Sequence, residues 1–237
     1  MERIEYPIRI NRYLLLKNLC SRREADRLIE SGKVTVNGAP AVLGQKVQED
    51  DIVEVDAEVT NRVHHYYLYH KPIGVVSHNP QRDEESVAMV SGLGPSVSPV
   101  GRLDKNSRGL MLLTDDGRIV NAVLHPDYAH EREYEVVVDK YIKEGDLKKM
   151  AKGVDIEGYV TKPSVVKRLD DDAFSITLTE GKKHQIRRMC AALGYAVTDL
   201  VRVRMMHLPL DIREGEHRAL TKPEITKLLK TARIPTN

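Results

Sequence analysis

The stretch GRLDKNSRGLMLLTDDG, residues 101–117, restricts the fold more than any other part of the 237-residue chain. Its apolar centre, LMLLT at 110–114, has the length of a strand and predicts one that is buried on both faces. A polar loop containing Asp104 comes before this run, and the turn Asp-Asp-Gly follows it. An aspartate at that position is a typical N-cap, so we expect a helix over 117–124. A strand buried on both faces needs a covering layer on each side.

Strands and isolated helices alternate through the remainder of the chain, from about residue 65. The pattern predicts strands within 66–77, 132–139, 173–179 and 200–210, and helices within 144–153 and 184–194. The fold class that follows is α+β, with a mixed, mainly antiparallel sheet flanked by helices.

The first sixty residues carry the signals of a small separate unit. RINRYLLLKNL has helical apolar spacing, and Ser21 with Glu24 three positions later forms a capping box at the start of a second helix. Gly32 is placed to end that helix, and Asn37-Gly38 is a hairpin turn. We therefore divide the chain into a domain at 1–60, a linker at 61–64 and a second domain at 65–237.

Basic residues are clustered, although the formal net charge is only +2. Residues 1–38 carry eight Lys or Arg against five acids, and 180–204 carry six against two. The run Ser21-Arg22-Arg23-Glu24-Ala25, followed by IxxGxVxVNG from Ile29, resembles the S4 RNA-binding domain. A solvated helix face would explain any one of its cations, but a cluster favours RNA binding. The resemblance implies that five residues face RNA phosphates: Arg9, Arg12, Arg22, Arg23 and Lys33.

Several classes of protein are disfavoured. Cys20 and Cys190 are far apart within apolar patterns, which favours reduced core thiols over a disulfide. The nine histidines lack the spacing of a metal site, so we expect no metal. The chain has no apolar run of about 18 residues and no signal-peptide core at its N-terminus, so we expect a cytoplasmic protein with no membrane partner.

The loop around Asp104 fits none of the common nucleotide or hydrolase motifs. GRLDKNSRG is not a GxxxxGK[ST] or a GxGxxG sequence, and Ser107 is not in a GxSxG context. Asp115 and Asp116 are better explained as a helix cap than as a catalytic carboxylate pair. This leaves Asp104 as a lone carboxylate for nucleophilic or general-base work. A cation that would hold it ionised is expected in the distant segment TEGKKHQIRRM, residues 179–189, where Arg187 opens a helix.

Four motifs in order resemble the bacterial ribosomal RNA pseudouridine synthases of the RsuA/RluB/RluF group. The first is Lys71-Pro72-x-Gly74, and the second is GRLDKNSRGLMLLTDDG itself. Glu133-Tyr134 matches a K-x-Y motif, although Arg132 replaces the usual Lys. Leu178, Gly181 and QIRRM at 185–189 match the last motif. An N-terminal S4 domain is expected in this family.

The resemblance implies an RNA isomerase that needs no cofactor and converts a uridine to pseudouridine. Asp104 is implied as the nucleophile, attacking either the ribose C1′ or C6 of uracil, and Arg187 as its ion-pair partner. Tyr134 is implied to stack on the flipped-out uracil. Leu178 and Ile186 would wall the pocket, and Arg102 would contact a phosphate, fill the space left by the extruded base, or form a structural ion pair.

Within the group the chain most resembles the RluF type, which implies a uridine of 23S, or large-subunit, rRNA as the target. Small-subunit 16S rRNA and tRNA are alternative targets, and a non-catalytic RNA-binding or ribosome-assembly factor is the alternative from another class. The expected partner is ribosomal RNA, free or in an assembling large subunit, and we expect a monomer. Four further residues favour other roles: Lys71 a turn role, Arg202 and Arg204 a solvated strand face, and His184 packing or an RNA contact.

Overall fold

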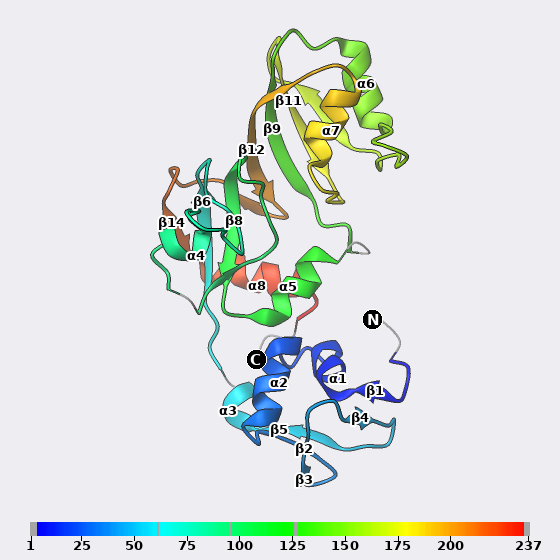
Figure 1. Ribbon diagram of the computed structural model, residues 1–237, viewed down its shortest axis with the longest axis vertical. Helices are drawn as coiled ribbons and strands as arrows, with labels where there is room; N and C mark the ends of the chain where they lie inside the picture. Colours follow the sequence, from blue (N-terminus) through cyan, green and yellow to red (C-terminus); the bar gives the residue numbers. More distant parts are fainter. Residues whose placement is uncertain (1–3, 61, 95, 126–127, 235–237) are drawn as a thin grey trace.

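The computed structural model describes residues 4–60, 62–94, 96–125 and 128–234. A small N-terminal unit ends with α3 (Ala57–Thr60), and residues 62–65 lead into β6 (Tyr66–Lys71), the first strand of a larger unit. In Figure 1 the N-terminus of α2 (Arg22–Glu30) faces the larger unit beneath α5 (Gly117–Leu124). The structure has no helix, within its described part, that is long and apolar enough to cross a membrane.

The small unit forms as its local signals predict. Ser21 Oγ caps α2 by accepting a hydrogen bond from the backbone N–H of Glu24 at 3.3 Å, which is one half of the predicted capping box. The Glu24 carboxylate pairs with Arg62 instead of completing it. Asn37 and Gly38 both have positive φ angles, 52° and 78°, as a tight hairpin turn requires. Its other elements are β1 (Ile8–Arg9), α1 (Ile10–Leu16), β2 (Val34–Val36), β3 (Ala39–Pro40), β4 (Lys46–Val47) and β5 (Val53–Val55), and they enclose an apolar core of their own.

The larger unit is built on one nine-stranded sheet. Its main path runs β10-β11-β9-β12-β8-β6-β14, and β12 and β8 form the parallel pair among otherwise antiparallel neighbours in the described chain. The predicted mixed, mainly antiparallel sheet is therefore confirmed. The strands not yet given are β7 (Ser98–Pro99), β8 (Arg108–Thr114), β9 (Arg132–Val138), β10 (Val165–Arg168), β11 (Ala173–Leu178), β12 (Val197–Met205), β13 (Leu208–Pro209) and β14 (His217–Ala219).

Two groups of helices pack on two different halves of the sheet (Figure 1). α5 and α8 (Lys222–Thr231) contribute to the core beside β6 and β8, whereas α6 (Glu144–Lys152) and α7 (Gln185–Ala192) contribute to the core beside β9, β11 and β12. A third apolar cluster lies under the loops between β6 and β8, which include the short helix α4 (Val87–Val90). LMLLT is buried along its whole length, as predicted, because it has packed side chains on both faces.

Gly109 makes the junction between the two halves possible. Its φ is +115°, and a Cβ there would lie 2.5 Å from the backbone N and O of Arg202. Only glycine lets β8 come this close to β12. The two halves of the sheet meet directly beside the loop that carries Asp104.

Candidate active site

The loop between β7 and β8 holds Asp104 by its backbone. The Asp104 carbonyl accepts from the Ser107 N–H at 3.0 Å. Leu103 exchanges two hydrogen bonds with Ser77 Oγ, at 2.9 Å and 2.7 Å. Because these contacts lie on either side of Asp104, the backbone is anchored while the carboxylate stays 38% exposed.

Lys71 also contacts the loop that carries Asp104, through the Lys105 carbonyl. Its side chain is fully buried, and Nζ donates to the carbonyls of Pro72 and Val75 at 2.8 Å each, with a longer contact to Lys105 at 3.5 Å. Burial lowers the pKa of this amine to about 8, and the negative charge of Asp104 opposes that shift. The expected turn role of Lys71 agrees with these contacts.

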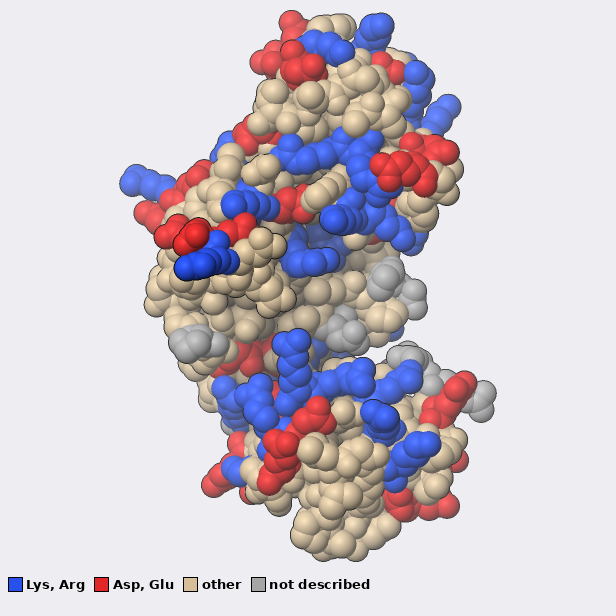
Figure 2. Space-filling model, viewed as in Figure 1, with Lys and Arg blue, Asp and Glu red and all other residues tan. Residues whose placement is uncertain are grey.

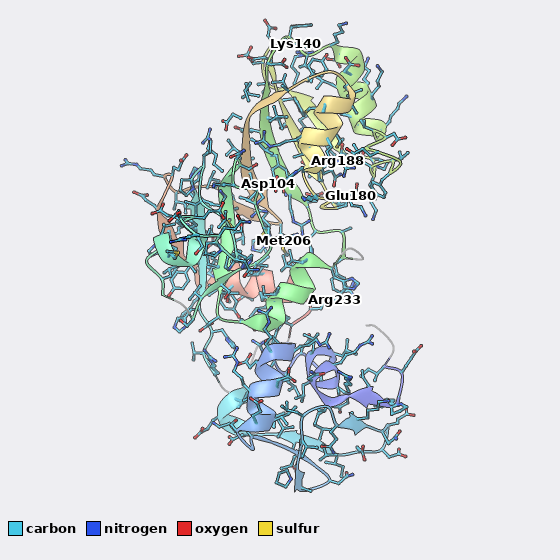
Figure 3. The ribbon with its side chains drawn as sticks, viewed as in Figure 1. Asp104, Lys140, Glu180, Arg188, Met206 and Arg233 are labelled. Carbon is cyan, nitrogen blue, oxygen red and sulfur yellow. The ribbon has the colours of Figure 1, made fainter. Side chains whose placement is uncertain are left out.

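The predicted catalytic residues lie around one groove of about 1040 Å³. Figure 3 shows Asp104 beside the middle of the sheet and Glu180 near the N-terminal end of α7. β9 brings Tyr134 opposite Ile176 of β11, and the first turn of α7 completes the wall. The six residues expected in the pocket all line this groove: Arg102, Asp104, Tyr134, Leu178, Ile186 and Arg187.

The expected ion pair between Asp104 and Arg187 is wrong for this structure. Arg187 Nη2 donates to the Asn106 carbonyl at 2.6 Å and lies 3.5 Å from Ser107 Oγ, while Nη1 donates to the Val197 carbonyl at 3.0 Å. Arg187 therefore binds the backbone just after Asp104, because three acceptors surround its guanidinium. The basic side chain in contact with the carboxylate is instead His184, whose Nε2 lies 3.5 Å from Asp104 Oδ1.

Arg202 is also placed differently from the prediction. A solvated strand face was expected, but its side chain is only 2% exposed. Nε donates to the Leu110 carbonyl at 2.6 Å, and Nη2 has no hydrogen-bond partner among the described atoms. The pKa of Arg132 is lowered, mainly because this side chain is partly buried. The positive charge of nearby Arg202 lowers it further. Arg204, by contrast, forms surface ion pairs with Glu131 and Glu133.

The DDG turn is structural, as the helix-cap interpretation predicts. Asp116 is fully buried, accepts from Tyr66 Oη at 2.6 Å and from the Arg118 backbone N–H at 3.1 Å, and thereby caps α5. Asp115 accepts from the His65 N–H at 2.8 Å. Both carboxylates are occupied outside the groove.

The groove is strongly basic. Figure 2 shows Lys and Arg along both sides of the hollow between the two units. Its two acidic lining residues are Asp104 and Glu180, and the Glu180 carboxylate already accepts hydrogen bonds from Tyr159, Gln185 and the Lys162 N–H. The nine cationic lining residues are Arg23, Arg102, Lys105, Arg132, Lys162, Lys182, Lys183, Arg187 and Arg202. Such a surface suits a polyanion.

The five cations expected on the small unit do not all line one cavity. Arg9, Arg12 and Arg22 line a separate hollow of about 850 Å³ beside α1. Lys33 pairs with Glu58 at 3.1 Å, which offsets its charge. Arg23 alone of the five lines the groove that contains Asp104.

Sequence reasoning placed His184 beside the site with a packing or RNA-contact role, without the contact to Asp104, and it did not single out His78. His184 occupies a left-handed conformation, φ 52° and ψ 30°, as the N-cap of α7, and this geometry brings its ring to Asp104. His78 lines the groove from the loop after β6. The position of His184 before the QIRRM helix was the available signal, whereas nothing local marks His78.

The chain is similar to known proteins over most of its length. The sequence model of the RNA pseudouridylate synthase family matches residues 65–192, and that of the S4 domain matches residues 8–53. The dual-specificity RNA pseudouridine synthase RluF of Escherichia coli (strain K12) is 41% identical over 228 residues, covering 94% of this chain and 79% of the relative. The ribosomal large subunit pseudouridine synthase B of Bacillus subtilis is 33% identical over 93% of this chain and 95% of its own.

A solved structure agrees with these matches. A crystal structure of a pseudouridylate synthase superimposes with a TM-score of 0.71 at 29% identity, covering 93% of this chain and 99% of that one. The similarity thus extends over the small unit, the sheet and the groove together.

Proposed function

The chain belongs to the RNA pseudouridylate synthase family, and from that premise we propose that it isomerises a uridine of 23S rRNA through Asp104. Isomerisation of an RNA uridine follows from the family itself. The large-subunit target, a monomeric enzyme, a cytoplasmic location and the residue roles are our proposal. The observation that carries it is the convergence of Asp104, Tyr134 and Arg187 on one basic groove.

Asp104 supplies the nucleophile in this proposal. Its carboxylate bonds to the ribose C1′ as the C1′–N1 bond breaks, or alternatively it adds to C6 of the uracil ring and the C1′–N1 bond breaks afterwards. The detached base turns and bonds to C1′ through C5, and the bond to the carboxylate breaks. C5 then loses its proton, and N1 gains one. Atoms and electrons balance without an oxidant or reductant.

Neighbouring residues position the base and the loop. The glycosidic bond is hidden inside an RNA helix, so the nucleotide has to leave its stack at a cost of a few kcal/mol. Tyr134 stacks on the extruded uracil, and Leu178 and Ile186 form apolar walls. Arg187 binds the Asn106 carbonyl and contacts the Ser107 hydroxyl, which keeps the loop that carries the Asp104 carboxylate in place. Arg102 contacts the RNA beside the vacated position.

The direct test compares Asp104→Asn with wild type on unmodified large-subunit rRNA. We expect wild type to form pseudouridine, mapped by carbodiimide primer extension, and the variant to be more than about 1,000-fold slower. Asp83→Asn is the matched control, because Asp83 is an exposed acid whose positive φ of 71° also suits Asn. Equal activity of Asp104→Asn and wild type would overturn the proposed mechanism.

The choice of RNA is tested in parallel. Small-subunit rRNA and tRNA are offered under the same conditions, since one similar protein is named for dual specificity. Modification of either one alone would replace the large-subunit assignment and leave the chemistry intact. Binding of rRNA without any modification would favour a ribosome-assembly role.

A further inference from the structure

Arg23 connects the small unit to the catalytic groove. It is the second residue of α2, and neighbouring helix positions point about 100° apart. Arg22 accordingly lines the hollow beside α1, while Arg23 lines the groove together with Arg102 and Asp104. Two adjacent arginines of one motif therefore face different cavities.

The position of α2 is held by contacts between the two units. A Cβ on Gly117, the first residue of α5, would lie 2.4 Å from the Ser21 Cβ, so the two helix starts are in close contact. Arg62 lies 3.5 Å from both Glu24 of α2 and Asp115 before α5. These contacts keep Arg23 at the rim of the groove.

Arg23 and Arg102 carry uncompensated charge. Both side chains are exposed, and the described chain offers neither one a hydrogen bond or an ion pair. His78 lies near both: its pKa is lowered first by partial desolvation and then by the charges of Arg102 and Arg23. The two acids of the groove are engaged elsewhere, Asp104 by His184 and Glu180 by Tyr159.

Two free guanidiniums at one hollow attract an anion that each can bind. The polyanion that this family brings to the groove is RNA, whose phosphates lie along the strand that carries the target uridine. We propose that Arg23 is a substrate-positioning residue of the catalytic groove, which binds a backbone phosphate beside the extruded nucleotide. The small domain thus contributes to the active site itself, in addition to binding RNA elsewhere. This inference rests on the proposed function.

The experiment uses the full chain with Arg23→Ala, Arg23→Lys and Arg27→Ala. Arg27 is the matched control, since it lies one turn farther along α2, is exposed and does not line the groove. The probe is the large-subunit transcript, measured by RNA affinity at several salt concentrations and by kcat and KM separately.

For Arg23→Ala we expect Kd and KM to rise about 10-fold, with kcat little changed. The salt slope of log K should fall by about 0.7–0.9, the value for one phosphate contact. Arg23→Lys should restore most of the affinity, because a lysine also binds a phosphate. Arg27→Ala should stay near wild type on every measure.

A second arm locates the phosphate once the modified uridine is mapped. RNA hairpins are made in which a single phosphate near that uridine is replaced by a neutral methylphosphonate. At one position the replacement should lower the RNA affinity of wild type and of Arg27→Ala, and it should leave the affinity of Arg23→Ala unchanged. Equal losses for Arg23→Ala and Arg27→Ala, or no such position, would refute the inference. The affinity arm needs no turnover, so an inactive wild type would count against the proposed function while Arg23 is still tested.

Discussion

At the scale of the residue, the surroundings of Asp104 separate two basic side chains that sequence reasoning treats together. His184 touches the carboxylate, at 3.5 Å, whereas Arg187 binds the carbonyls of Asn106 and Val197. The first contact is made to the proposed nucleophile itself, and the second holds the loop that carries it. Substitutions at the two positions should therefore have different consequences.

His184→Gln should reduce kcat/KM about 3- to 10-fold and leave stability unchanged. The contact is long and the His184 side chain is 49% exposed, so its pairing with Asp104 contributes only about 0.2–0.5 kcal/mol to the unfolding free energy. Arg187→Gln should lose more activity and also about 1 kcal/mol of unfolding free energy, because two carbonyls lose their charged donor. Tritium release from labelled rRNA and urea denaturation measure the two effects. The reverse pattern, with His184→Gln the less stable variant, would contradict this assignment.

At the scale of the element, α8 shows a helix whose start is secured by a capping box and an ion pair. Thr221 and Glu224 cap each other, and Arg218 of β14 donates to both Glu224 oxygens at 2.8 Å and 2.9 Å. The Arg218 hydrogen bond is the largest cause that lowers the pKa of Glu224 to about 2. Because the folded pKa lies below the ordinary value of 4.5, this carboxylate stabilises the protein above pH 4.5, and the contribution is lost as pH falls toward 2.

Glu224→Gln should lower the unfolding free energy by about 1–2 kcal/mol at neutral pH. The difference from wild type should shrink between pH 4.5 and 2, where wild type loses the same contribution. Urea midpoints at several pH values measure this. Glu216→Gln serves as control because Glu216 is exposed in the loop before β14. A difference from wild type that is constant across this pH range would show that the charge of Glu224 is not the cause.

At the scale of the whole molecule, the contact between α2 and α5 decides where the small unit lies. Gly117→Ala places a methyl group against the Ser21 Cβ, an atom that cannot move without moving α2. We expect a larger radius of gyration by small-angle scattering and a loss of the affinity that depends on Arg23. Gly145→Ala is the matched control, because it adds the same methyl group to the first turn of α6 with no heavy atom within 4 Å. Scattering and affinity that match the control would show that this contact does not position α2.

Local signals predicted much of the molecule. The Ser21 cap, the Asn37-Gly38 turn, the buried LMLLT strand and the helix over 117–124 depend on residues within a few positions of each other, and all are present. The same kind of signal at Thr221, Pro223 and Glu224 was available for α8, which was not predicted. The four motifs also indicated which side chains would meet at a groove.

The sequence by itself determined the elements and the chemical character of the groove, because both depend on residue type and short spacing. Only the tertiary structure decided which basic side chain touches Asp104, that Arg202 is buried, and that Arg22 and Arg23 face different cavities. These outcomes depend on distances between residues far apart in the chain. They are determined by how β12 packs against β8 and how α2 packs against α5, and no local pattern encodes those contacts.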